Sequence, residues 1–419
     1  MNEKLLQYIW NYKLFQDFNF VDTQGNPLEI IEFGKLNVNS GPDFELAKLK
    51  YKNLILYGNI ELHVLSSDWQ LHRHQNQKEY QSIILHVVFE HDKNIPELEK
   101  AEIPTLELKQ YINKETLEKY SNLQSNHNFI PCEKIFTPKN VPFLFSEEMV
   151  LKKLDEKSWE IEQLLSKNKN DYEAVLFQKI AYVFGLKVNA PIFLQIAQSI
   201  DFKIINKISQ NQFQLESLLL GKAHLLHEDI AESQPWHKEF RFLQSKFNLS
   251  DIYFPAKFLR LMPPSFPTIR LSQLATLYHR QQNLFSKIIK AQSVEELKSL
   301  FRGIKTSDYW EKHFIFGKET HRKQKRELSE DFIDIILINA LFPVIYMYFK
   351  NTKTENTELI LDFYKQLKAE KNSIINSWKA LGINLSSSLD SQAYLYLHKN
   401  FCKAKNCLNC GIGFQLLKT

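Results

Sequence analysis

Residues 54–64, LILYGNIELHV, and residues 82–89, SIILHVVF, decide the fold of the first part of this chain. Both runs are short, apolar and rich in β-forming residues, which predicts strands. Further strand-like runs, separated by turn-forming residues, lie at 28–33, 46–51 and 103–109. Before them, residues 3–15 carry apolar side chains at helical spacing, and the polar run 66–80 has room for a short helix. The pattern predicts helix, three strands, a helical or looped crossover, and two more strands.

The remainder of the chain has the apolar spacing of helices. The main interruption is FLRLMPPSFPTIR, residues 258–270, where three prolines forbid a continuous helix. We therefore predict an α+β protein. An α/β domain over 1–112, with a mixed sheet in helix-strand-strand-strand-helix-strand order, is followed by a packed linker over 113–145. A large, mainly α-helical domain over 146–419 completes it and includes one helix over 356–379.

Composition describes an ordinary folded chain rather than a specialised one. The 419 residues are 44% hydrophobic and 24% charged, with a formal net charge of +5. That charge is too small to mark a dedicated nucleic-acid binder, although a local basic groove is compatible with it. The start of the chain lacks the features of a signal peptide. The most apolar run, residues 332–349, is interrupted by Asp334, Asn339 and Pro343, which predicts a buried helix followed by a kink or break. We expect a cytoplasmic protein without a membrane span.

Acidic and histidine side chains gather near the first strands. Asp43 ends a Gly-Pro-Asp turn that leads into a strand, and Glu61 and His63 lie on the next strand. Strand alternation places Glu61 and His63 on one face of a half-buried strand, with Ile60 and Leu62 on the other. A hairpin between the two strands would bring Asp43 near Glu61. Two carboxylates there would bind Mg²⁺ or Mn²⁺, which can polarise a phosphoryl oxygen.

This arrangement resembles the PD-(D/E)XK nuclease fold at Pro42-Asp43 and at Glu61-Leu62-His63. The resemblance implies a metal-dependent nuclease in which Asp43 and Glu61 bind the ion and the helical domain grips nucleic acid. The chain departs from the pattern at His63, where the nuclease family usually has lysine. A histidine there would act as a general base, ligate the metal, or mark an inactive relative. That family commonly adds an acid from an upstream helix, for which Glu3 is the only early candidate.

Other histidines extend the cluster. His72 and His74, in SDWQLHRH, are candidates for further ligands or for contacts with the phosphates of nucleic acid, as is Asp68. His86, set in ILHVV, is more typical of a buried core histidine. One alternative is a zinc enzyme that uses several of these imidazoles. The other is that the Gly-Pro-Asp segment is simply a good turn and the Glu-x-His pair arose by chance.

A wider resemblance covers almost the whole chain. The segments NSGPDF, GNIELHVLSSDWQLHRH, IILHVVFEHD, FIPCEK and FPTIR, together with a cysteine-rich tail, resemble the bacterial family DUF2851, a domain of unknown function. That resemblance identifies a family but implies no established activity.

The tail itself has metal-ligand spacing, because Cys402-x4-Cys407-x2-Cys410 places three thiols close together. A tetrahedral site needs a fourth ligand, and the candidates are Cys132 and His398. Four thiolates would suit Zn²⁺ or a [4Fe–4S] cluster. Some iron–sulfur nucleases of the resembled fold join an early cysteine to a C-terminal trio in the same way. The alternative is a reduced, metal-free trio.

The proline-rich segment supplies two candidates for nucleic-acid binding, Arg260 and Arg270. Arginines on an irregular scaffold suit bidentate contacts with phosphate. The alternative is that the prolines only join two helices and the arginines pair with acids. The functional hypothesis is a metal-dependent, nuclease-like protein acting on nucleic-acid phosphodiesters. The competing hypothesis is a non-catalytic nucleic-acid-binding or scaffold protein with a structural zinc or iron–sulfur site.

Overall fold

A computed structural model of the chain describes residues 1–38, 40–72, 78–126, 128–354 and 356–418. The chain divides into two compact units. The first contains Met1–Phe145, Asn372–Asn384 and Leu397–Thr419, and the second contains Ser146–Lys371 and Leu385–Tyr396. The first division between the units falls between Phe145 and Ser146, and the cysteine-rich tail belongs to the first unit.

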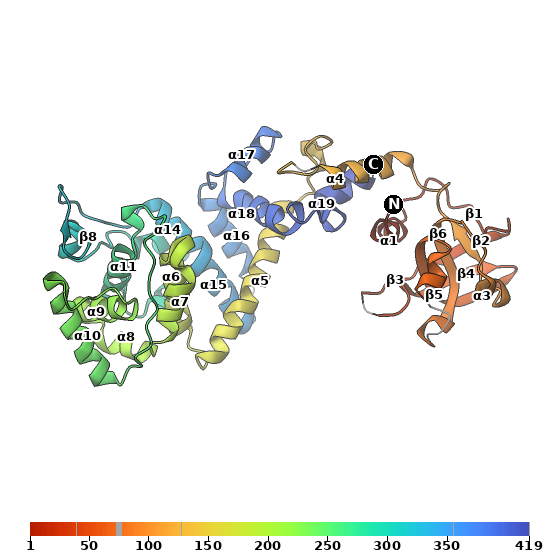
Figure 1. Cartoon of the computed structure of the whole chain (residues 1–419). Coiled ribbons are helices and arrows are strands. Elements are labelled where there is room, and N and C mark those ends of the chain that lie inside the picture. The colour runs from red at the N-terminus through yellow and green to blue at the C-terminus, as the bar shows by residue number, and fades with distance from the viewer. Residues whose placement is uncertain (39, 73–77, 127, 355, 419) are drawn as a thin grey trace. The chain divides into compact units, whose positions relative to one another are not determined.

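The first unit combines a mixed sheet with short helices (Figure 1). Its strands are β1 (Phe20–Val21), β2 (Pro27–Glu32), β3 (Lys35–Leu36), β4 (Phe44–Tyr51), β5 (Leu54–Leu65), β6 (Ile83–Glu90) and β7 (Thr105–Glu107). Its helices are α1 (Glu3–Tyr12), α2 (Asp68–Leu71), α3 (Pro96–Lys100), α4 (Lys114–Ser125), α17 (Ser373–Ala380) and α19 (Gly411–Lys418).

The sheet has the order β1-β2-β4-β5-β6-β7, and β3 also pairs with β4. Strands β2, β4 and β5 are antiparallel neighbours, whereas β5–β6 and β6–β7 are parallel. The sheet is therefore mixed, as predicted, and α1, β2, β4, β5, α2 and β6 follow the predicted order of helices and strands. Ile60, Leu62, Leu85 and Val87 are fully buried, because central strands pack against neighbours on both faces.

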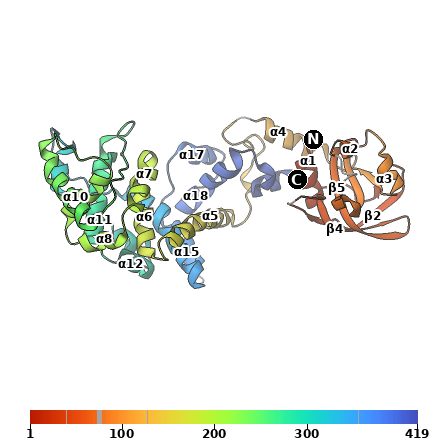
Figure 2. The ribbon, with the colours of Figure 1, turned by 60° about the horizontal axis from the view of Figure 1, so that its bottom comes forward.

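Helix α1 contacts β5, beside which it lies in Figure 2. The Asn2 side chain caps the helix by accepting a hydrogen bond from the Leu5 backbone N–H. Leu6, Ile9 and Trp10 are fully buried, so this amphipathic helix packs its apolar side into the unit. Its polar residues near the N-terminus are thereby left facing the site described below.

The segment 113–145, predicted as a packed linker, begins with a regular helix, because α4 occupies Lys114–Ser125. Asn113 caps this helix by accepting a hydrogen bond from the Glu115 backbone N–H. Thr116, Tyr120 and Leu123 recur at helical spacing and are buried, which gives the helix its packing face. The prolines of this segment, Pro131, Pro138 and Pro142, all follow the helix and do not interrupt it.

The second unit is largely helical (Figure 1). Its main helices are α5 (Phe145–Lys167), α6 (Tyr172–Phe184), α7 (Leu186–Gln198), α8 (Phe202–Ile208), α9 (Gln212–Lys222), α10 (Gln234–Phe247), α11 (Pro267–Arg280), α12 (Leu284–Lys290), α13 (Val294–Ser299), α14 (Glu330–Ile336), α15 (Phe342–Thr352), α16 (Thr357–Gln366) and α18 (Ser388–Leu397). A short hairpin is formed by β8 (His313–Ile315) and β9 (Lys318–Glu319).

The single helix predicted over 356–379 is wrong. The chain leaves the helical conformation after Gln366, and Ala369 donates a backbone hydrogen bond to Ser386. A new helix begins at Ser373, where the Asn372 side chain accepts from the Ile375 backbone N–H. Asn372 is thus a helix cap, a role in which asparagine is strongly favoured.

The most apolar segment is one continuous helix, Glu330–Thr352, in which a π-helical turn over Leu337–Leu341 joins α14 to α15. Pro343 lies in the first turn of α15, so the predicted break is a π turn. In the part of the chain that the structure describes, this helix alone is long and apolar enough to cross a membrane, and 72% of its apolar window is buried. Such burial is typical of a core helix.

Candidate metal site and other functional residues

The register of β4 and β5 places Asp43 opposite Glu61. Phe44 pairs with Ile60, so the residue before Phe44 meets the residue after Ile60. The Asp43 backbone N–H donates a hydrogen bond to Glu61 Oε2 over 3.1 Å, and the Leu62 N–H donates to Asp43 Oδ2 over 3.0 Å. The structure thus brings together the two acids that the sequence singles out. Gly41, with φ of 107°, allows the turn that delivers them.

Helix α1 contributes two polar side chains to the same place. Gln7 Nε2 donates a hydrogen bond to Asp43 Oδ1 over 2.7 Å. Glu3 lies one helical turn earlier, on the same side of α1. Glu3 is the early acid that the nuclease resemblance singles out, whereas Gln7 was not predicted. The four-residue spacing of these two polar residues at the start of an amphipathic helix is the signal that identifies both.

His63 and His86 form a contact between the parallel strands β5 and β6. His63 Nδ1 and His86 Nε2 are 3.0 Å apart, and His63 Nε2 lies 3.8 Å from Glu61 Oε1. Around these residues the strand is buried on both faces and not half-buried as predicted, because Glu61 and His63 are only 4% and 1% exposed. The Trp69 ring of α2 covers the two imidazoles, with centroids 6.2 Å from His63 and 5.2 Å from His86.

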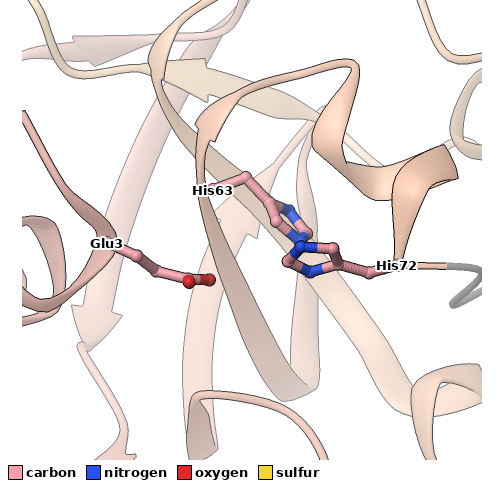
Figure 3. Close-up of side chains that lie close together, drawn as sticks. All are labelled: Glu3, His63 and His72. Carbon is pink, nitrogen blue, oxygen red and sulfur yellow. The ribbon is translucent and has the colours of Figure 1, made fainter.

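One group of possible metal ligands converges here from three elements (Figure 3). Glu3 of α1, His63 of β5 and His72, directly after α2, each offer a donor atom, and these atoms lie within 4.8 Å of one another. His72 is exposed, so this side of the group is open to solvent. Asp68 Oδ2 accepts a hydrogen bond from the Leu65 N–H and so stabilises the turn. His74 lies outside the described residues.

Crowding of carboxylates shifts their ionisation. Burial, together with the nearby charges of Asp43 and Glu3, raises the pKa of Glu61 to about 9. Burial, together with the charge of Glu3, raises the pKa of Asp43 to about 6. The pKa of Glu3 is raised by burial and lowered by His72. Three acids that resist ionising together form a place where a cation would be strongly favoured.

The four cysteines, which are far apart in the sequence, line one cavity of the first unit together with apolar side chains. None of the four forms a disulfide in the part of the chain that the structure describes. Burial raises the pKa of Cys132 to about 12 and that of Cys407 to about 11. The other proposed ligand, His398, stacks its ring on Phe129 with centroids 4.4 Å apart. Among the alternatives left open by the sequence, the structure groups Cys132 with the three cysteines of the tail.

The two arginines of the proline-rich segment have different surroundings within the second unit. Arg260 is exposed and adopts a φ of 63°. Arg270 lies in the first turn of α11, where its guanidinium packs 3.9 Å from the centre of the Phe332 ring and donates to Gln273 Oε1 over 3.0 Å. Burial lowers the pKa of Arg270 to about 10. Arg260 is therefore the better placed of the two to meet a phosphate.

Comparison with known proteins gives one match. The family model described as "Protein of unknown function (DUF2851)" matches residues 3–373. No curated protein and no solved structure matches the chain. The matched region includes the acid–histidine residues and Cys132, whereas the three tail cysteines lie beyond it.

Proposed function

We propose that this chain, which belongs to the DUF2851 family, is a metal-dependent hydrolase that cleaves nucleic-acid phosphodiesters. The observation that carries the proposal is the convergence of Glu3, His63 and His72 within 4.8 Å, beside the hydrogen-bonded pair Asp43 and Glu61. Acids and imidazoles from the first helix, two strands and a loop meet at one partly open place.

The donor set fits Mn²⁺ better than Mg²⁺. Carboxylate oxygens suit either ion, but imidazole nitrogens favour transition metals. The raised pKa values of Asp43 and Glu61 agree with this assignment, because a bound cation would replace the protons that otherwise relieve their repulsion. When bound, such an ion polarises a phosphoryl oxygen and lowers the pKa of water.

The protein's own residues have separate roles in the proposal. Gln7 and the Leu62 N–H hold both oxygens of Asp43, which fixes the carboxylate in place. His63 serves as the base and not as a ligand, so Glu3, His72, Asp43 and Glu61 are left to hold the ion. Its Nδ1 contacts His86 Nε2, which fixes the orientation of the ring, and its Nε2 takes a proton from the attacking water. His72 lies at the exposed side, where a phosphate would enter. His63 thus substitutes for the lysine of the nuclease pattern.

Nucleic acid as the substrate is supported by exposed basic residues of the second unit. The loop after β9 reads HRKQKR from His321 to Arg326, and most of this loop is exposed. With Arg260 it supplies positive charge of the kind that contacts phosphate backbones. Contacts of this kind give affinity without sequence readout, which would suit an enzyme that acts on many sites.

A cleavage assay tests the proposal. The full chain is incubated with Mn²⁺ or Mg²⁺ and with single- and double-stranded DNA and RNA. We expect cleavage with Mn²⁺ that falls by at least about a hundredfold in Asp43→Asn and Glu61→Gln. Glu45→Gln is the matched control, because Glu45 is an exposed acid on the same strand.

Two outcomes would contradict the proposal. The first is no cleavage of any of these substrates by the wild-type chain with either ion. In that case, binding of nucleic acid that weakens steeply with salt and is unchanged in Asp43→Asn would support the non-catalytic binding alternative. The second is equal cleavage by Asp43→Asn and Glu45→Gln, which would place the chemistry elsewhere.

A further inference from the structure

The cavity that contains the four cysteines lies in the first unit, and none of its lining residues belongs to the acid–histidine site described above. Cys132 comes from the turn after α4, whereas the other three come from the segment before α19. Leu123, Trp378 and Ile412 also line the cavity. Three stretches separated widely in the sequence therefore meet at this point, and each contributes either a thiol or an apolar wall.

Two short helical turns carry Cys402 and Cys407. Cys402 ends a π-helical turn over His398–Cys402, and Cys407 begins a 3₁₀ turn over Cys407–Asn409. The Cys410 N–H donates to the Cys407 carbonyl over 3.2 Å, which closes the Cys-x2-Cys loop. π-helical turns are uncommon and frequently occur at functional sites.

Close backbone packing fixes this loop against α19. A Cβ added at Gly413 would lie 2.0 Å from the Cys407 carbonyl oxygen, so only glycine fits there. Two hydrogen bonds join α4 to the tail. Gln124 Nε2 donates to the Lys405 carbonyl over 3.1 Å, and Lys405 Nζ donates to the Gln124 carbonyl. These contacts hold the tail against the end of α4, beside the turn that carries Cys132.

Four thiols in an apolar cavity call for an explanation. Cys132, Cys402 and Cys407 are buried, and none of the four cysteines forms a disulfide. The chain contains four cysteines in all, so every one of them is in this group. Tetra-thiolate sets with Cys-x2-Cys spacing bind Zn²⁺ or iron–sulfur clusters and, with four protein ligands, leave no position open for substrate.

We propose that Cys132, Cys402, Cys407 and Cys410 hold a structural metal centre bound through four thiolates. The centre joins the turn after α4 to the C-terminal tail and closes the first unit. It is separate from the acid–histidine site, so its presence does not depend on the proposed hydrolase function.

Metal analysis of the purified full chain tests this proposal. Protein expressed in medium supplied with iron and zinc and purified without oxygen is examined by elemental analysis, sulfide assay and absorption spectroscopy. One zinc per chain identifies a mononuclear site. Four irons and four sulfides per chain, with a broad band near roughly 400 nm, identify a cluster. Absence of both in the folded protein would overturn the proposal.

Variants locate the centre. Cys407→Ser and Cys410→Ser should each lower the metal content of this site by more than about half, whereas Glu61→Gln, in the other site, should leave it unchanged. Unchanged metal content in both cysteine variants would overturn the proposal. The wild-type chain supplies a second readout that does not depend on the folding of the cysteine variants: a chelator should make the four thiols react faster with an alkylating reagent. If chelation does not alter their reactivity, no metal protects them and the proposal fails.

Discussion

The Asp43 backbone N–H donates a hydrogen bond to Glu61 Oε2 over 3.1 Å, while the side chain of Asp43 is itself held by Gln7. The two carboxylates are thus fixed close together, with Glu61 almost entirely removed from water. Their repulsion cannot be relieved by movement of either side chain alone. It has to be relieved by a proton or by a cation, and this requirement leads to the predictions below.

The metal-free protein should lose stability as the pH rises. Glu61 keeps its proton in the folded chain up to about pH 9, whereas an unfolded glutamate loses it near 4.5. Folding between these values takes up a proton, so the free energy of unfolding falls with rising pH, by at most about 1.4 kcal/mol per pH unit for this group. The pKa of Asp43 is raised from 3.8 to about 6, so this group adds to the fall in the free energy of unfolding between those two pH values.

Denaturant titrations of chelator-treated protein between pH 5 and pH 9 would measure this slope. Glu61→Gln should flatten it, because glutamine resembles the protonated acid and does not titrate. Mn²⁺ should stabilise the wild-type chain most at high pH, where it competes with fewer protons. A slope that is the same in wild type and Glu61→Gln would show that this carboxylate does not govern stability.

His63→Gln should lower kcat by about 10²- to 10⁴-fold with little change in KM, because the imidazole is the proposed base. The acidic limb of the pH–rate profile should disappear with it. His86→Gln should have a smaller effect, since His86 acts through its contact with His63. Retention of the acidic limb in His63→Gln would assign that ionisation to another group. Thermal unfolding of each variant controls for structural damage.

Glu3→Gln should weaken Mn²⁺ binding by about tenfold, a loss of about 1.4 kcal/mol, because one of the converging donors loses its charge. Calorimetry with Mn²⁺ measures this directly. Glu29→Gln is a suitable control, since Glu29 is an exposed acid of β2. Equal affinities in the two variants would remove Glu3 from the ligand set.

Gly413→Ala should destabilise the first unit, because its new methyl group would meet the Cys407 carbonyl oxygen. Overpacking of this kind typically costs about 1–3 kcal/mol. Gly411→Ala is the matched control on the same helix, since its added Cβ would lie 3.2 Å from the nearest atom, in the Pro142 ring. Thermal unfolding should show a larger loss of stability for Gly413→Ala than for Gly411→Ala. A larger loss for Gly411→Ala would contradict the predicted packing.

The strands could be located from the sequence because their signal is local. LILYGNIELHV and SIILHVVF carry β-forming residues in short runs, and β5 (Leu54–Leu65) and β6 (Ile83–Glu90) follow those runs closely. The two-residue strands β1 and β3 were not predicted. Strands so short have no periodicity, and their pairing depends on neighbours that the sequence does not show.

The candidate site was predicted only in part, for a related reason. Alternation along one strand connects Glu61 with His63, and a turn connects Asp43 with its strand. The approach of Glu3 and Gln7 depends instead on how α1 packs against the sheet. The pairing of His63 with His86 depends on the parallel register of β5 and β6, in which Glu61 lies beside His86. Neither relationship has a local signature in the chain.

The return of residues 397–419 to the first unit determines the order in which the protein can fold during synthesis. Roughly 250 residues separate Phe145 from Leu397, and at about 5–20 residues per second the ribosome takes on the order of ten seconds to a minute to make them. Throughout that interval the sheet and α4 lack their partner segment. The first part of the chain to be made is thus among the last to be finished, and the nascent chain carries an incomplete unit that chaperones would need to protect.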